Sequence, residues 1–213
     1  MNLPTLRNVY WIMKIGRIRR LIPFLLLFAA QAAWARPTGT ATIEKANTRL
    51  RELLATKAEG DAEKKLLAKV TTELRDLFDI GDLAKRALVD HWAKMTPDQR
   101  TRVVDTLRAI VERNYIRQLR SNLEYAIQYK TEESQGADVL VKTVIQAQRK
   151  GRPFEVTVDY LLHPAGEAWK VYDVTTDDVS ILQNYRSQFN RIIAKDGVNG
   201  LITRMKNKLE QAE

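Results

Sequence analysis

The stretch VLVKTVIQAQRKGRPFEVTVDYLLHPAGEAWKVYDVT, residues 139–175, holds three apolar runs rich in β-branched and aromatic residues. The short Gly-containing segments RKGR and HPAGE separate these runs. Parallel strands need a crossover of about a dozen residues or more, so strands this close in the sequence pair antiparallel. The stretch therefore predicts a β-meander with strands over 139–148, 154–162 and 169–175.

Apolar residues on both sides of this meander recur at helical spacing. They predict helices over 41–58, 61–77, 79–92, 97–121, 179–195 and 201–209. Thr96 and Gln99 have the spacing of a capping box, with Pro97 at the first helical position, and Gly197 separates the last two helices. Helices gathered on one face of an antiparallel sheet define an α+β fold.

The composition excludes several kinds of chemistry. The 213-residue chain has no cysteine, which rules out disulfides, thiolate metal sites and a cysteine nucleophile. Its two histidines, His91 and His163, lie far apart in the sequence, so they form no spaced metal motif. Neither G-x-S-x-G nor a P-loop occurs, and adjacent acids such as Asp177-Asp178 lie beside predicted turns. We predict no metal site and no catalytic residue.

The N-terminal segment has the pattern of an export signal rather than of an uncleaved anchor. Basic residues precede the apolar run 21–30, and Ala33-Trp34-Ala35 follows it as a small-x-small cleavage site. The run is shorter than the roughly 20 residues that a membrane span needs. We predict a signal peptide over 1–35 (with Met13 as an alternative start), a leader over 36–40 and one domain over 41–213.

The positive net charge decreases if the signal peptide is removed. Residues 1–35 hold five of the 35 basic residues and none of the 26 acidic ones, so +9 becomes +4. In an exported chain, this modest excess favours anionic membrane surfaces or acidic protein partners over nucleic acid. Four arginines share one margin of the helix over 97–121, either as a solvated face or as a partner or headgroup contact: Arg102, Arg113, Arg117 and Arg120.

The predicted strands are apolar on both faces. Over 169–175, one face carries Trp169 and Val171, and the other carries Tyr172 and Val174. A curved sheet covered by helices either packs solid or encloses a cavity. Periodicity does not distinguish the two, so a filled core and a pocket both remain open at this point.

Several segments resemble the MlaC-type, or toluene-tolerance, periplasmic proteins. They are LFDIGDLAKRAL at 77–88, TPDQR at 96–100, WKVYDV at 169–174, VSI at 179–181, NYR at 184–186 and QF at 188–189. The likeness extends over about 41–209 and includes the spacing of the strands and closing helices. The chain departs from the family at Val89 and Asp178, where glycine is usual.

This resemblance implies a periplasmic phospholipid carrier rather than an enzyme, with no cofactor besides the bound phospholipid. It implies partners at both membranes, namely an outer-membrane lipoprotein complex and an inner-membrane ABC transporter with an MCE-domain subunit. Such transport maintains outer-membrane lipid asymmetry. The implied fold is a curved antiparallel β-meander covered by several helices, which enclose an apolar pocket as in cystatin/NTF2-like cones.

We predict that this pocket is lined from the long helix, the sheet and the closing helix. The predicted lipid-binding residues are Leu107, Val111, Tyr115, Val144, Val156, Val158, Tyr160, Trp169, Val171, Tyr185 and Phe189. Two alternatives remain. An exported hydrolase or isomerase on an NTF2-like scaffold would need a buried polar group, with Asp159, Asp173 or His91 as candidates. A non-catalytic interaction module would have a filled core.

Overall fold

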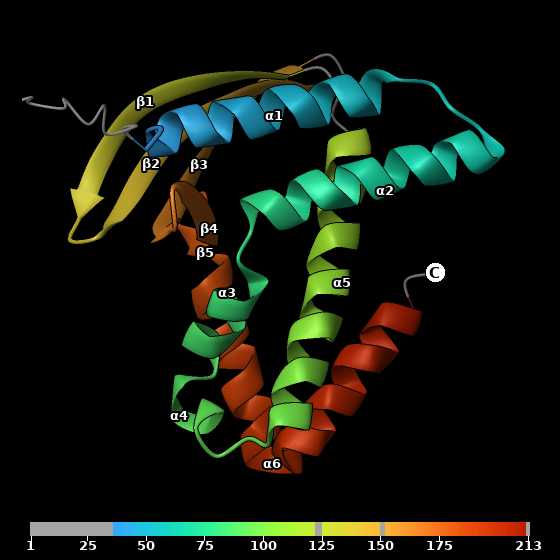
Figure 1. The fold of residues 1–213 in the computed structure, drawn as a ribbon, viewed down its shortest axis with the longest axis vertical. Helices are drawn as coiled ribbons and strands as arrows, with labels where there is room; N and C mark the ends of the chain where they lie inside the picture. Colours follow the sequence, from blue (N-terminus) through green and yellow to red (C-terminus); the bar gives the residue numbers. More distant parts are fainter. Residues whose placement is uncertain (1–35, 122–124, 150–151, 212–213) are drawn as a thin grey trace, which may run out of the picture. The chain divides into compact units, whose positions relative to one another are not determined.

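The computed structural model describes residues 36–121, 125–149 and 152–211 (Figure 1). The predicted signal peptide over 1–35 lies outside them. The helices are α1 (Gly39–Ala55), α2 (Gly60–Leu77), α3 (Ile80–Ala87), α4 (Val89–Trp92), α5 (Pro97–Ser121) and α6 (Ile181–Glu210). The strands are β1 (Tyr125–Gln135), β2 (Asp138–Arg149), β3 (Arg152–Ala165), β4 (Ala168–Thr176) and β5 (Val179–Ser180).

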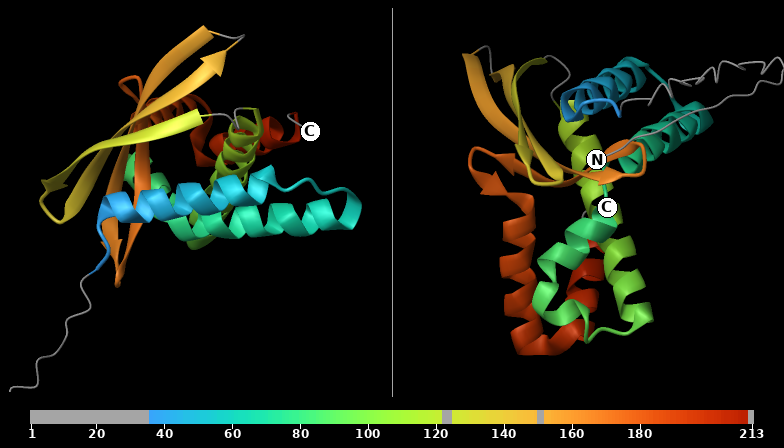
Figure 2. Two further views of the ribbon diagram at one scale, coloured as in Figure 1. Left: turned by 90° about the horizontal axis from the view of Figure 1, so that it is seen from above. Right: turned by 60° about the vertical axis from the view of Figure 1, so that its left-hand side comes forward.

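The strands of the described residues form one antiparallel sheet in the order β1-β2-β3-β4-β5. The predicted α+β class and the predicted meander are therefore confirmed. The register shifts between Tyr129 and Thr131 and again between Leu161 and Leu162. Such irregularities bend and twist strands, and Figure 2 shows the curvature of the sheet that results.

The short strand β5 is not among the predicted strands. Asp177 and Asp178 have φ angles of 45° and 65° between β4 and β5, the left-handed conformation that a two-residue type I′ turn needs. The Asp177 carboxylate accepts a hydrogen bond from the Thr157 N–H at 3.0 Å, which fixes the turn. Asp178 thus takes a glycine-like conformation at a position where the resemblance leads one to expect glycine.

Local side chains set the helix ends. The Gln99 N–H donates to the Thr96 hydroxyl at 3.2 Å and the Thr96 N–H donates to the Gln99 side chain at 3.0 Å, so the predicted capping box is present. The predicted helix over 79–92 divides at Leu88, whose φ of −104° and ψ of 23° are not helical. Gly197, at φ 69°, breaks α6 into two halves that fold back on each other (Figure 1).

Helix α1 packs closely on the sheet. Gly39 permits this approach, because a Cβ there would lie 2.7 Å from Val139 Cγ2. Glu132 of β1 also holds the helix start, since its carboxylate accepts hydrogen bonds from the Gly39 and Thr40 N–H groups at 3.1 and 2.8 Å. The sheet thereby binds α1 at one end, while α5 and α6 extend away from it (Figure 1).

The buried apolar residues form three clusters. One joins α3, α5 and α6 around Leu107, one packs α1 on the sheet around Val141, and one joins α1 to α2 around Val70. Phe78, between α2 and α3, packs against all three clusters. The core is therefore divided into three parts, and Phe78 connects them.

Candidate lipid-binding pocket

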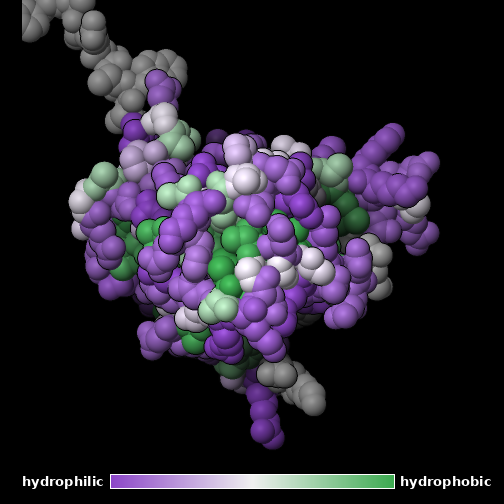
Figure 3. Space-filling view, turned by 90° about the horizontal axis from the view of Figure 1, so that it is seen from below, coloured by the Kyte–Doolittle hydropathy of each residue, from purple (hydrophilic) through white to green (hydrophobic). Residues whose placement is uncertain are grey.

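A pocket of about 610 Å³ lies between the sheet and helices α5 and α6. This volume is within the range of roughly 300–1,000 Å³ that is usual for ligand sites. Seen from below the view of Figure 1, the surface is mainly hydrophilic, with small hydrophobic areas between polar side chains (Figure 3). The pocket is lined by Asn47, Phe78, Val111, Asn114, Tyr115, Tyr125, Ile127, Ile145, Ala147, Phe154, Val156, Val158, Tyr160, Val174, Thr176, Ile181, Asn184, Tyr185, Gln188 and Lys208.

The sheet forms one wall of the pocket, because side chains alternate between the two faces of each strand. Successive side chains of a strand point to opposite faces, so Val156, Val158 and Tyr160 of β3 share the pocket face. The register places Ile145 opposite Val156 and Val174 opposite Tyr160. Neighbouring strands therefore present one continuous apolar surface to the pocket.

The helices contribute aromatic side chains to the other wall. Tyr115 of α5 contacts Phe78 edge-to-face, with ring centroids 5.5 Å apart. Tyr185 of α6 stacks on Phe189 at 5.3 Å. Phe189 itself is buried behind this wall, so it supports the ring of Tyr185 from the core side.

The polar groups of the pocket are neutral apart from Lys208. Burial raises the pKa of Tyr115 well above its ordinary value, and burial likewise raises the pKa of Tyr160 and Tyr185. These phenols therefore stay protonated at physiological pH. The lining includes no Asp, Glu or His among the described residues, so the wall offers no carboxylate or imidazole for acid–base chemistry.

The candidate catalytic groups of the hydrolase alternative lie elsewhere. The buried carboxylate of Asp173 accepts hydrogen bonds from the Ser180 hydroxyl at 2.6 Å and the Leu182 N–H at 2.9 Å, so it anchors the start of α6. Asp159 and His91 do not line the pocket. None of the three candidate groups of the hydrolase alternative therefore lines the pocket.

Six of the residues predicted to line a pocket do lie on this wall. They are Val111, Tyr115, Val156, Val158, Tyr160 and Tyr185. Their contact with lipid stays a prediction, because a place on the pocket wall does not by itself show that a residue touches lipid.

The other five predicted residues do not line this pocket, and their contact with lipid also stays a prediction. Leu107 and Phe189 are buried in the cluster of α3, α5 and α6, and Val171 is buried in the sheet cluster. Val144 precedes Ile145 on β2 and therefore points to the opposite face of the sheet. Trp169 lies near the start of β4, whereas the pocket residues Val174 and Thr176 lie near its end. The Trp169 indole donates to the Pro37 carbonyl at 2.7 Å.

The sequence analysis missed other lining residues. Ile127, Ile145 and Val174 belong to strand faces whose orientation depends on the register. Phe78 lies in the short connection between α2 and α3, where periodicity gives no information. Alternation within β1 is the one pattern that could have identified Ile127.

Most of the predicted arginine margin has partners within the chain. Arg113 donates hydrogen bonds to the backbone carbonyls of Leu209 and Lys208, so it ties α5 to the end of α6. Arg102 lies 3.6 Å from Asp98, and Arg117 donates to Asn114 at 2.8 Å. The side chain of Arg120 lies outside the described residues. A role in partner or headgroup contact stays a prediction for these residues.

Two features are absent from the described residues. None of their helices is long and apolar enough to cross a membrane. Nor do they contain a group of three or more His, Cys, Asp or Glu side chains that could hold a metal ion.

The fold and the pocket together define an α+β protein built to bind an apolar ligand. Residues 44–207 match the family model described as MlaC protein, and the chain belongs to this family. It is also similar to a solved structure, the phospholipid-binding protein from Ralstonia solanacearum in complex with a phospholipid. That match has a TM-score of 0.68 and 24% identity, and it covers 82% of this chain and 98% of the other. The comparison with curated proteins found no match.

Proposed function

We propose that the protein is a periplasmic carrier that holds phospholipid acyl chains in the apolar pocket. It shuttles the lipid between an outer-membrane lipoprotein complex and an inner-membrane ABC transporter with an MCE-domain subunit. It acts by binding and release, without catalysis. Membership of the MlaC family and the phospholipid in the Ralstonia solanacearum structure support this ligand class.

The observation that carries the proposal is the composition of the pocket wall. Aliphatic and aromatic side chains from four strands and two helices surround about 610 Å³, and Lys208 is the one charged residue of the described lining. Each buried methylene is worth about 0.8 kcal/mol relative to water, so two chains of about 16 carbons represent roughly 25 kcal/mol. A carrier has to match most of this apolar burial, otherwise extraction of lipid from a bilayer stalls.

The test places the same charge on the two faces of one strand. Ile127 lines the pocket, whereas its neighbour Gln128 is exposed and accepts a hydrogen bond from Lys130 at 2.6 Å. We expect Ile127→Glu to remove most of the phospholipid that co-purifies with the protein, because it places a charge against the acyl chains. Gln128→Glu should keep the wild-type amount.

Lipid extraction with mass spectrometry measures the bound lipid, and circular dichroism checks that both variants are folded. Equal phospholipid content in the two folded variants would refute an acyl-chain pocket. Transfer itself is tested separately, by mixing lipid-loaded protein with acceptor vesicles that carry the membrane partners.

A further inference from the structure

The apolar pocket has a shielded end and an open end. Asn47 and Tyr160 are 6% and 4% exposed, so their part of the lining is closed to solvent. Thr176, Asn184 and Lys208 are exposed residues of the same lining, so the pocket opens where they lie. We call the polar residues of this opening the mouth, and they are Asn114, Thr176, Asn184, Gln188 and Lys208.

Helices α5 and α6 bring the side chains of the mouth together. The Arg113 guanidinium donates hydrogen bonds to the backbone carbonyls of Lys208 and Leu209. Asn114, the next residue of α5, is thereby placed beside the last turn of α6, and both Asn114 and Lys208 line the pocket. One cation and one amide from different helices therefore lie side by side at the mouth.

The amides of the mouth have their oxygens engaged and their N–H groups available. The Asn114 side-chain oxygen accepts a hydrogen bond from Arg117 at 2.8 Å. The Asn184 side-chain oxygen accepts one from Gln188 at 2.7 Å. A side-chain amide also carries two N–H donors, so these remain for a ligand. An oxyanion, which has only acceptors, is complementary to them.

The positive charge of the mouth has no carboxylate partner among the described residues. Lys208 is the one charged residue of the described lining, and Arg117 pairs with an amide oxygen. Because Arg113 already donates to the carbonyls at the end of α6, Lys208 is not needed to satisfy them. The nearest acidic residues along the chain, Asp177 and Glu210, do not line the pocket.

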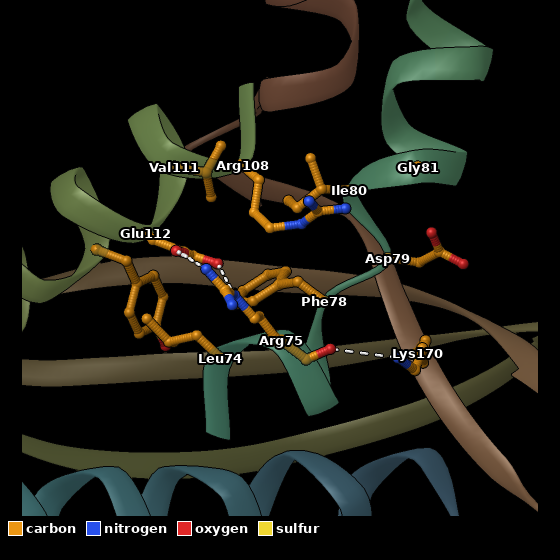
Figure 4. Close-up of a pocket in the computed structure, with 11 residues that line it drawn as sticks. Leu74, Arg75, Phe78, Asp79, Ile80, Gly81, Arg108, Val111, Glu112 and Lys170 are labelled. Carbon is orange, nitrogen blue, oxygen red and sulfur yellow. Dashed lines mark hydrogen bonds and ion pairs between the residues drawn. The ribbon is translucent and has the colours of Figure 1, made fainter. Parts of the chain in front are cut away.

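A smaller pocket of about 320 Å³, drawn in Figure 4, has no such surplus of positive charge. In this figure the Arg75 guanidinium pairs with Glu112, at 2.7 Å. Arg108 has an acidic partner in its own helix, also at 2.7 Å, and the lining contains the carboxylate of Asp79 as well as Lys170. Its cations and carboxylates are balanced, whereas those of the mouth are not.

We propose that the mouth binds the phosphate group of a phospholipid through Lys208 and the amide of Asn114. This inference rests on the proposed function and deepens it, because it names the residues that recognise the charged part of the same ligand. Lysine binds phosphate as a point charge and needs no fixed geometry, which suits an exposed position. The mouth and the apolar wall belong to one pocket, so the phosphate and the acyl chains of one molecule can occupy both.

The experiment uses lipid-free protein and three probes of known chemistry. Dihexanoyl phosphatidylglycerol has both tails and phosphate, dihexanoylglycerol has tails only, and inorganic phosphate has no tails. Calorimetric titration gives the affinities of wild-type protein, Lys208→Gln and Asn114→Ala. The matched controls are Lys206→Gln and Asn207→Ala, since both residues are exposed on the same turn of α6 as Lys208 and neither lines the pocket.

We expect Lys208→Gln to weaken phosphatidylglycerol binding about tenfold, the usual scale for one charge-assisted hydrogen bond. Asn114→Ala should weaken it about fivefold, because it removes neutral donors. The controls should stay within about twofold, and dihexanoylglycerol should bind all variants alike. The loss in Lys208→Gln should decrease at about 1 M salt, which screens an exposed charge but not the burial of tails.

Inorganic phosphate distinguishes the two sources of the same anion. Phosphate binding that is lost in Lys208→Gln supports the site and shows that it also accepts free phosphate. The two losses for phosphatidylglycerol, together with no measurable binding of inorganic phosphate, assign the site to lipid phosphate alone.

Unchanged phosphatidylglycerol affinity in Lys208→Gln would overturn the inference and leave the carrier function standing. An equal loss of dihexanoylglycerol binding would overturn it too, because the variant would then have damaged the apolar wall. If the wild-type protein binds neither lipid probe, the proposed function fails, and the inference that rests on it fails as well.

Discussion

Tyr185 and Phe189 lie one turn apart on α6 and their rings stack, yet the structure gives them different roles. Phe189 is 3% exposed within the helical core, whereas Tyr185 lines the apolar pocket. We expect Phe189→Ala to lower the free energy of unfolding by about 3–5 kcal/mol, because it leaves a cavity in packed surroundings. Tyr185→Ala should cost only about 1 kcal/mol, since one side of its ring already faces a cavity.

The two variants should rank in the opposite order for the loss of bound lipid. Tyr185→Ala removes a wall residue and should reduce bound phospholipid, while folded Phe189→Ala should retain it. Urea unfolding of delipidated protein measures stability, because bound lipid would itself stabilise the folded state. With a slope of about 1–3 kcal/mol per molar urea, the midpoint of Phe189→Ala should fall by at least about 1 M. Wild-type stability with lost lipid in Phe189→Ala would refute the division between core and wall.

Three further predictions concern the frame around the pocket. Asp173→Ala should lower stability by about 3 kcal/mol in thermal unfolding, because the buried Leu182 N–H loses its acceptor; a loss below about 1 kcal/mol would contradict this. Burial raises the pKa of Glu132, but the hydrogen bonds from Thr40 and Gly39 outweigh burial and hold that pKa below its ordinary value. The ionised Glu132 carboxylate therefore stabilises the fold above its ordinary pKa, and this stabilisation is lost as the pH falls through the folded-state pKa. Glu132→Gln should reduce the loss of stability at acid pH by at most about 1 kcal/mol. An unchanged loss of stability at acid pH would count against the role of Glu132 at the start of α1. Asp178→Gly should keep or raise stability by up to about 1 kcal/mol while Asp178→Val lowers it, because of the positive φ; equal unfolding midpoints would show no strain at this turn.

Features that depend on neighbouring residues could be predicted from the sequence. Thr96, Pro97 and Gln99 contain the whole capping box within four positions, and the start of α5 follows from them. The meander followed from connections too short for any other pairing. Gly197 ended a helix where its conformational freedom was needed.

The pocket wall could be predicted only in part, since it depends on packing between distant segments. Val158 and Val171 both belong to the buried sheet cluster, but only Val158 also lines the cavity. What separates them is where α1, α2 and α5 lie over the sheet, and no periodicity records that. The left-handed conformation of Asp177 and Asp178 was not predicted for a related reason, because aspartate adopts it only where the chain requires it.

Phe78 shows how the frame holds one residue of the pocket wall in place. Its N–H donates to the Leu74 carbonyl at the end of α2, and the next N–H, of Asp79, donates to the Val171 carbonyl, each at 2.8 Å. The backbone is therefore held by a helix on one side and by β4 on the other, while Phe78 also lines the apolar pocket. Because this ring also packs against all three core clusters, its rotation would loosen the contact of the sheet with both helical clusters at the same time.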